Sequence, residues 1–170
     1  LILSGFLGPT HGTERVGGKD PRRAATRQMI GYLPEANPLP LHVRVREYLR
    51  FRAVLKGLAG KAAAAAIADT VDNCRIGDMA DRMIGQLSKG MRQRVGLAES
   101  ILAKPEVLIL DEPTAGLDPH QAYQTRELIT RLGAGTTVLL SSHILGDIER
   151  LCRRVIILDR GSVAADGDLE

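Results

Sequence analysis

The chain has 170 residues, of which 44% are hydrophobic and 25% are charged, a composition that indicates one globular domain with a sizeable core. Its apolar runs are far too short to cross a bilayer, which argues against an integral membrane protein. The formal net charge is only +3. The basic excess lies in residues 1–60 without interleaved aromatic residues, so we expect no nucleic-acid partner.

The two cysteines, Cys74 and Cys152, lie far apart and show no metal-ligand spacing. We interpret them as free thiols of a protein from a reducing compartment.

The first forty residues contain few regular elements. Leu1–Phe6 is apolar and is expected to be the end of a helix, which the following glycines and a proline stop. Residues 13–16 predict a weak short strand. Gln28–Leu33 predicts a better strand, and Pro34 ends it.

The middle of the chain is helical. From Val43 onward, apolar residues recur at steps of three and four, which predicts an amphipathic helix. Its expected buried stripe consists of Val45, Tyr48, Phe51, Leu55 and Leu58. The alanine-rich stretch Lys61–Asn73 predicts a second helix, because alanine is the best helix former.

The second half of the chain alternates helices and strands. A helix is expected from Ser88, its N-cap, to just before Pro105, with a buried stripe of Met91, Val95, Ala98, Ile101 and Leu102. The further expected elements are a buried strand at 106–110, a helix at 119–132, a second buried strand at 136–142, a helix at 144–152, and two strands on either side of the turn at 160–161. Such alternation predicts an α/β layered domain with a largely parallel sheet, interrupted by the helical block at 43–73.

The stretch GTERVGGKD, Gly12–Asp20, comes close to the G-x-x-x-x-G-K-[ST] loop that binds the phosphates of ATP. Its spacing is wrong by one residue, and Asp20 stands where a hydroxyl should bind Mg²⁺. A phosphate loop must also follow a buried strand and open a helix, whereas Gly12 follows a turn rich in glycine and proline. We therefore predict that this stretch does not bind phosphate.

The stretch VLILDEPTAGLD places two carboxylates, Asp111 and Glu112, directly after a buried strand. Ligands of open α/β sheets bind at the carboxyl ends of the strands. Asp111 is thus placed to hold Mg²⁺, and Glu112 to orient and deprotonate an attacking water. Alone, the pair could equally be a solvated turn.

Two further motifs accompany these carboxylates. LSKGMRQR puts Ser88, Lys89 and Gly90 at a helix start, where free backbone N–H groups favour an anion. LLSSHIL puts His143 just beyond the second buried strand, beside the carboxylates if the two strands pair. Taken singly, the first could be an ordinary N-cap and the second a structural histidine.

In this order and spacing, the motifs resemble the nucleotide-binding subunit of an ABC transporter, most of all those of bacterial ABC-2 type exporters. LSKGMRQR is similar to the signature motif, VLILDEP to Walker B, AGLDP to the D-loop, SSHIL to the switch-histidine loop and IGYLPE to the Q-loop. Two residues differ from the wider family, because Glu35 replaces a glutamine and LSKGM replaces LSGGQ.

The resemblance implies an α/β fold of the P-loop NTPase type over 1–170, with a helical subdomain at 43–100 and an α/β core built from 1–42 and 101–170. It also implies that the chain begins inside the helix that follows the phosphate loop. We therefore expect the phosphate loop, the preceding strands and the adenine-stacking aromatic residue to lie upstream of Leu1, and the fragment alone to be inactive.

The resemblance further implies ATP and Mg²⁺ as ligands and a role for each motif residue. Glu112 and His143 would be catalytic, and Asp111 and Glu35 would serve the metal. Nucleotide contacts would come from Leu87, Ser88, Lys89, Gly90, Met91, Glu35 and Asp118. Ser88 and Gly90 would reach the γ-phosphate held by a partner copy, and Asp118 would couple the two sites.

The resemblance implies two kinds of partner: a second ATP-binding domain, in a homodimer or heterodimer, and a membrane-spanning permease subunit that would hold the protein on the cytoplasmic face of the membrane. The basic helix with Arg46 and Arg50 would contact the permease, unless it is simply a solvated face. Two alternatives stay open, a soluble ABC ATPase that acts on ribosomes or DNA and a non-catalytic interaction module.

Overall fold

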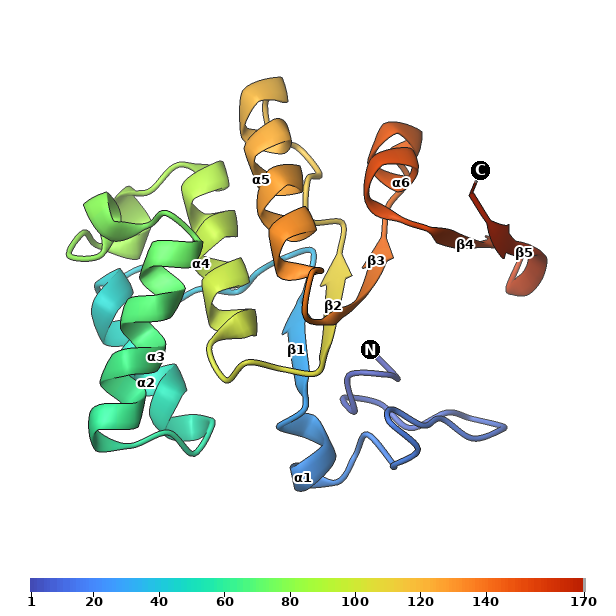
Figure 1. Ribbon diagram of the computed structural model, residues 1–170, viewed down its shortest axis with the longest axis horizontal. Helices are drawn as coiled ribbons and strands as arrows, with labels where there is room; N and C mark the ends of the chain where they lie inside the picture. Colours follow the sequence, from blue (N-terminus) through green and yellow to red (C-terminus); the bar gives the residue numbers. More distant parts are fainter. Residues whose placement is uncertain (170) are drawn as a thin grey trace.

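A computed structural model describes residues 1–169 and contains a three-stranded parallel sheet with helices packed on one face (Figure 1). The strands lie in the order β1 (Ile30–Leu33), β2 (Val107–Asp111) and β3 (Thr137–Ser141). In the register of β2 and β3, Asp111 is paired with Ser141. All three strands point the same way, so their carboxyl ends share one edge of the sheet.

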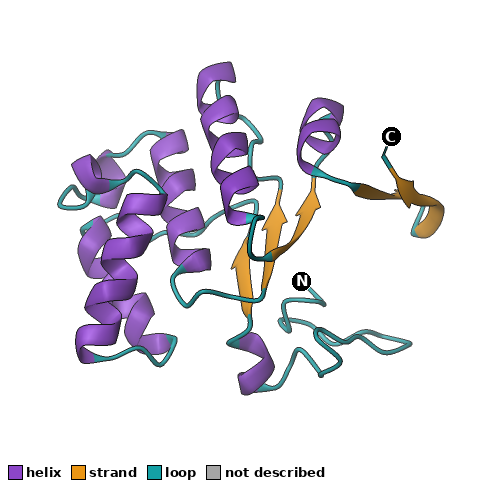
Figure 2. Ribbon diagram, viewed as in Figure 1, coloured by secondary structure: helices purple, strands orange, loops and turns teal. Residues whose placement is uncertain are grey.

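The long helices cover one face of this sheet (Figure 2). Leu108 and Leu110 of β2 are fully buried and belong to one core cluster with Leu128 and Ile129 of helix α5 (Pro119–Leu132). Helix α4 (Lys89–Ile101) packs directly on β1, where a side chain in place of Gly31 would lie 2.3 Å from the carbonyl oxygen of Ser100. Both helices begin at the edge where the strands end (Figure 1).

Local sequence explains the starts of these two helices. Ser88 caps α4 by accepting a hydrogen bond of 3.3 Å from the Met91 amide. Asp118 caps α5 by accepting a hydrogen bond of 2.9 Å from the Gln121 amide. Pro119 is the first helical residue, and it has no backbone N–H that would be left without an acceptor. The predicted N-cap of α4 and the predicted bounds of α5 are confirmed.

Helices α2 (Val45–Leu55) and α3 (Gly60–Asn73) pack beside α4, with short 3-10 turns at Gly77–Met79 and Ile84–Gln86. The predicted buried stripe of α2 was partly wrong. Val45 is buried as predicted, but Phe51 and Leu55 are exposed, because Leu49 and Ala53 face α3 and α4 instead. The division of the chain at residues 43 and 100 stays a prediction.

The N-terminal segment differs from the expectation. Leu1–Phe6 forms turns and no α-helix, with the Phe6 amide bonded to the Leu1 carbonyl at 3.1 Å. The weak strand at 13–16 is reduced to one bridge between Val16 and Lys19. A short helix, α1 (Ala24–Arg27), precedes β1.

The C-terminal part lies beside the sheet. Helix α6 (Leu145–Leu151) follows β3, and β4 (Arg154–Asp159) pairs antiparallel with β5 (Ser162–Asp168) in a hairpin of its own. The predicted strand at 136–142 exists, but alternate residues of β3 are exposed, so its predicted burial was wrong. In the described part of the chain, β3 is the last strand of its sheet, and this leaves Leu139 42% exposed.

Candidate functional site

The carboxyl ends of the parallel strands bring predicted site residues together, as the sequence suggested. Asp111 ends β2 and Glu112 follows it, Ser141 ends β3, and His143 stands two residues further on. We call Asp111, Glu112, Ser141 and His143 the strand-end cluster. Glu35 follows the end of β1 by two residues.

Glu112 is the most constrained member of the strand-end cluster. Its backbone has φ +48°, a left-handed conformation that a non-glycine residue rarely adopts and that often marks a functional site. Its amide donates a hydrogen bond of 3.1 Å to the Ser141 carbonyl. One carboxylate oxygen, Oε1, lies 2.8 Å from His143 Nδ1. The other, Oε2, is buried without a hydrogen-bond partner. A buried polar atom without a partner is costly, and a catalytic role is one explanation for such an atom.

The Glu112 carboxylate raises the pKa of His143, first through this hydrogen bond and then through its charge. The charges of Glu35 and Asp147 raise it further, while desolvation lowers it. Glu35 therefore acts on the cluster electrostatically. The His143 side chain is 73% exposed and the Glu112 side chain 17%, so the histidine lies at the protein surface and the carboxylate lies further inside.

Asp111 is held from the neighbouring strand, because the Ser141 hydroxyl donates a hydrogen bond to its Oδ1. Asp111 and Ser141 also line a hollow of about 510 Å³ on the sheet face away from the helices, together with Tyr32. The rest of its lining comes from the N-terminal segment and the sheet and is apolar except for Ser4: Leu1, Ile2, Leu3, Ser4, Leu7, Ile109, Leu110 and Leu139. Desolvation, followed by the charge of Asp111, raises the pKa of Tyr32.

Residues Leu87–Met91 form a second group at the start of α4, which we call the signature turn. Ser88 and Lys89 are exposed, whereas Leu87 and Gly90 are buried. A Cβ at Gly90 would lie 2.3 Å from Gln121 Oε1, so a larger residue there would require the Gln121 side chain to move. The Ser88 hydroxyl has a backbone partner in its own helix. Among residues 1–169, no hydrogen bond or ion pair joins Ser88 to the strand-end cluster.

Two amide side chains that the sequence reading did not single out hold these groups in place. Gln93 of α4 donates a buried hydrogen bond of 3.0 Å to the Pro113 carbonyl, next to Glu112. Asn37, two residues after Glu35, donates one of 3.0 Å to the Arg92 carbonyl. Asn37 has φ +38°, and polar residues of this kind tolerate that conformation. Helix α4 is thereby tied to the segments after β1 and β2.

The stretch GTERVGGKD does not have the geometry of a phosphate loop. Val16 and Lys19 exchange backbone hydrogen bonds of 2.9 and 3.0 Å around Gly17 and Gly18, which have φ +56° and +76°. Positive φ at both central residues defines a tight hairpin turn. No helix begins there, because α1 starts only at Ala24.

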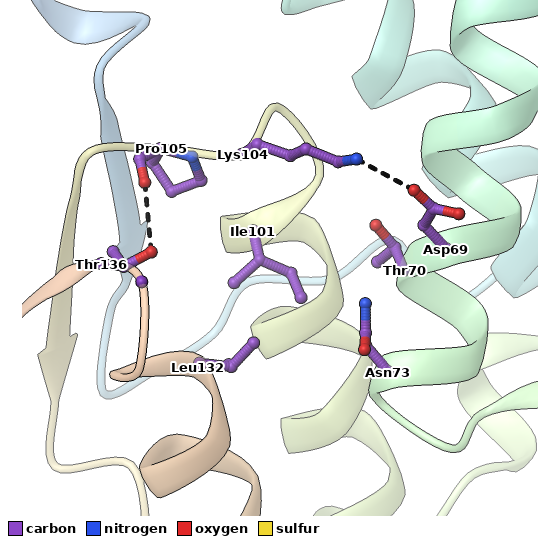
Figure 3. A pocket seen from close by; sticks show the side chains of 9 residues that line it. Asp69, Thr70, Asn73, Ile101, Lys104, Pro105, Leu132 and Thr136 are labelled. Carbon is purple, nitrogen blue, oxygen red and sulfur yellow. Dashed lines mark hydrogen bonds and ion pairs between the residues drawn. The ribbon is translucent and has the colours of Figure 1, made fainter.

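A separate pocket of about 280 Å³ lies between the C-terminal ends of α3 and α4 and the start of β3 (Figure 3). Figure 3 shows Lys104 reaching Asp69 across it, at 3.0 Å. Thr136, one residue before β3, also lines it. This is the amino end of the strand, so the pocket is at the opposite edge of the sheet from the strand-end cluster.

Comparison with known proteins identifies the family. The family model described as ABC transporter matches residues 1–115. The chain belongs to the ABC transporter family. The signature turn, Asp111 and Glu112 lie within the matched residues, and His143 lies beyond them.

The relatives of this ABC protein are ATP-binding proteins. It is 34% identical over 169 residues to "Uncharacterized ABC transporter ATP-binding protein YxlF" of Bacillus subtilis, and the match covers 99% of this chain and 56% of the relative. It is 36% identical to "Nod factor export ATP-binding protein I" of Burkholderia orbicola, covering 98% of this chain and 56% of the relative. The chain therefore spans about half the length of the curated relatives that it matches.

Solved structures agree with the fold. An ATP-binding subunit of an ABC transporter matches with a TM-score of 0.84 and 29% identity, over 98% of this chain and 71% of that one. CbiO1 from Clostridium perfringens, described as part of the ABC transporter complex cbiONQ, matches with a TM-score of 0.85 and 27% identity, over 98% and 69%. The predicted ABC ATPase fold with its parallel sheet is confirmed.

Proposed function

We propose that the protein to which this chain belongs binds and hydrolyses ATP to power transport, in the direction of export, through a separate membrane-spanning subunit. The observation that carries the proposal is the state of the Glu112 carboxylate. One oxygen, Oε1, lies 2.8 Å from His143 Nδ1, the other is buried without a hydrogen-bond partner, and the residue directly follows Asp111 at the end of β2. A recessed carboxylate that follows a strand end and contacts a histidine at the surface is suited to accept a proton from an attacking water.

The contacts within the strand-end cluster support a role for each of its members. Glu112 would act as the general base, and His143, on the exposed side of that carboxylate, would contact the terminal phosphate and orient the water. Ser141 would fix the Asp111 carboxylate through its hydrogen bond. Positioning and electrostatics carry most of the catalysis in phosphoryl transfer, so the short contacts of this cluster are what the reaction requires.

The carboxylates fit a Mg²⁺ ion that arrives with ATP. Among the described residues, no group of three or more potential ligands could hold a metal by itself. Mg²⁺ in nucleotide sites is held by one or two carboxylates plus phosphate oxygens and water, and Asp111 meets this need, with Glu35 as the second candidate. Bound Mg²⁺ would neutralise charge that builds up on the phosphate oxygens.

The signature turn would serve a second copy of the ATP-binding domain. Among the described residues, no hydrogen bond or ion pair joins its Ser88 to the strand-end cluster, and Ser88 and Lys89 are exposed at a helix start. In a head-to-tail dimer, Leu87–Met91 of one copy would face the ATP bound by the other. Asp118, which caps α5, would lie between the two sites and couple them.

The membrane subunit would dock on α2, close to the segment after β1. This helix exposes Phe51, Val54 and Leu55, which are each at least 60% exposed. Of the basic residues that the sequence suggested, Arg46 already pairs with Asp81 at 2.9 Å. The docking face is therefore proposed to be apolar, with Arg50 as its charge. None of the described helices has the length and apolarity of a membrane span. Docking on the membrane subunit would place the protein on the cytoplasmic face of the membrane.

The polypeptide 1–170 alone is proposed to bind ATP weakly, because its one stretch resembling a phosphate loop is a hairpin turn. A titration with a fluorescent ATP analogue and Mg²⁺ tests this point. Micromolar binding that Lys19→Ala abolishes would contradict it.

The decisive test of the function uses Glu112→Gln in the full-length gene product. ATP binding should persist, while hydrolysis slows by at least ~10²-fold because the general base is lost. The matched control is Glu106→Gln, the same change at an exposed residue at the other end of the same strand. Turnover close to wild type in Glu112→Gln would remove Glu112 from the proposed role.

A further inference from the structure

Asp147 is a buried carboxylate to which the proposed function gives no task. It lies in the first turn of α6, four residues after His143, and it is 1% exposed. A buried carboxylate is stable only with partners that compensate its lost hydration. The partners of Asp147 come from two other segments of the chain.

The first partner is Thr114, two residues after Glu112, whose hydroxyl donates a hydrogen bond to Asp147 Oδ2. Thr114 is itself only 2% exposed. The second partner is Arg126 of α5, whose Nη1 donates to Asp147 Oδ1 at 2.7 Å. One carboxylate therefore joins the segment after β3 to the segment after β2 and to α5.

The contacts of Asp147 lie just beyond the point where the pairing of β2 and β3 ends. The pairing of β2 and β3 ends at Asp111 and Ser141, and the last backbone bond across it is from the Glu112 amide to Ser141. Beyond that point one segment runs into α5 and the other into α6. The contact of Thr114 with Asp147 is a further link between them, just outside the pair Glu112 and His143.

We propose that Asp147 is a positioning residue, which fixes His143 relative to Glu112 by anchoring the His143 segment to Thr114 and Arg126. The inference rests on the proposed function of these two side chains. A neutral amide in place of the Asp147 carboxylate would offer one acceptor oxygen instead of two, so Thr114 and Arg126 could not both keep their hydrogen bonds. It would also leave Arg126, whose Nε is already buried and unpartnered, without a counter-ion. The two segments would then be free to shift.

The kinetic test compares variants of the full-length gene product. Asp147→Asn should lower kcat by about tenfold while KM for ATP changes by less than about twofold, as when a supporting partner of a site residue is removed. Thr114→Val should have the same effect, and the double variant should cost no more than either change alone, because the residues act as a unit. Thr114→Ser, which keeps the hydroxyl, should retain kcat.

The matched control is Asp166→Asn, which makes the same change in the exposed pair of Asp166 with Arg154 and should leave kcat unaltered. A kcat for Asp147→Asn equal to that of the control, or a loss seen in KM alone, would overturn the proposal. If Asp147→Asn fails to fold, Thr114→Val carries the same test, since it removes one hydroxyl and no charge.

Amide hydrogen exchange separates this proposal from the proposed function. The amides of Ala115 and Leu117 bond to the carbonyls of Glu112 and Thr114 and report on that segment. They should exchange faster in Asp147→Asn and Thr114→Val than in Asp166→Asn. A wild-type protein without ATPase activity would refute the proposed function. The exchange rates of the Ala115 and Leu117 amides would still test the role of Asp147, because they do not depend on activity. Unchanged exchange would refute the anchoring.

Discussion

The strand-end cluster and the signature turn begin at the same edge of the sheet, but the molecule holds them differently. In the strand-end cluster, residues at the end of β3 contact residues at the end of β2: His143 contacts Glu112, and Ser141 bonds to Asp111. Just outside the cluster, Thr114 bonds to Asp147 in the same way. The hydroxyl of the signature turn is bonded only to its own helix, and its side chains at 88 and 89 are exposed. One group is thus organised within the chain, whereas the other is presented outward.

This difference indicates which residues depend on the fold and which depend on a partner. A change in the strand-end cluster should alter chemistry in each copy. A change in the signature turn should leave the fold of its own copy unchanged and should impair the ATP site of the partner copy. Variants at Ser88 test the signature turn, and Glu112→Gln tests the strand-end cluster.

The largest effect is expected from Ser88→Arg, which places bulk and positive charge at the exposed start of α4. In a full-length Glu112→Gln background that accumulates ATP-bound dimers, this change should abolish dimers while each monomer still binds ATP. Light scattering after size exclusion measures the dimer. Ser162→Arg, at an exposed position of β5, is the control and should dimerise. Dimers formed normally by Ser88→Arg would show that the turn does not face a partner.

A smaller effect is expected from Ser88→Ala on stability. The hydroxyl accepts one bond from the Met91 amide, so its loss should cost about 1 kcal/mol of unfolding free energy, as for other N-caps. Urea unfolding of the nucleotide-free protein measures this. A much larger loss would mean that Ser88 has further internal partners, and the contrast between the two groups would then fail.

The smallest effect concerns the His143 titration. Glu112 raises the pKa of His143 above its ordinary value of 6.5. The folded state therefore binds this proton more tightly than the unfolded state. The resulting stabilisation is fully present below 6.5 and is lost as pH rises through the folded pKa. NMR titration, with His143→Gln to assign the signal, should show the raised pKa and its return towards the ordinary value in Glu112→Gln. If the His143 pKa stayed raised in Glu112→Gln, Glu112 would not be the cause of the shift.

Much of this architecture could be predicted from local sequence. The caps Ser88 and Asp118 and the residue Pro119 mark helix starts through bonds made within a few residues, so the predicted start of α4 and the bounds of α5 were right. The strand of apolar residues before Asp111 was also recognisable without its neighbours. Parallel pairing then placed Glu112 beside His143, as the sequence suggested.

Features that depend on distant partners could not be predicted in the same way. The buried face of α2 is set by α3 and α4, so the periodic pattern alone misplaced Phe51 and Leu55. Asp147 looks like an ordinary acidic residue of a first helical turn, and only the folded chain brings Arg126 to it. Gln93 likewise became visible only through its bond to Pro113.

One complementation measurement tests the central claim, that each ATP site combines the strand-end cluster of one copy with the signature turn of another. Full-length Ser88→Arg and Glu112→Gln proteins, each inactive alone, are mixed in equal amounts with ATP and Mg²⁺. In a mixed dimer, Ser88→Arg alters only one of the two sites and leaves the other with both groups intact, so hydrolysis should recover in part, to no more than the quarter or so of the wild-type rate that random pairing in a twofold dimer would give. A protein with both changes, mixed with the wild type, is the control and should form no active mixed site. No recovery in the first mixture would contradict the account, because it would place both groups in a site within one chain.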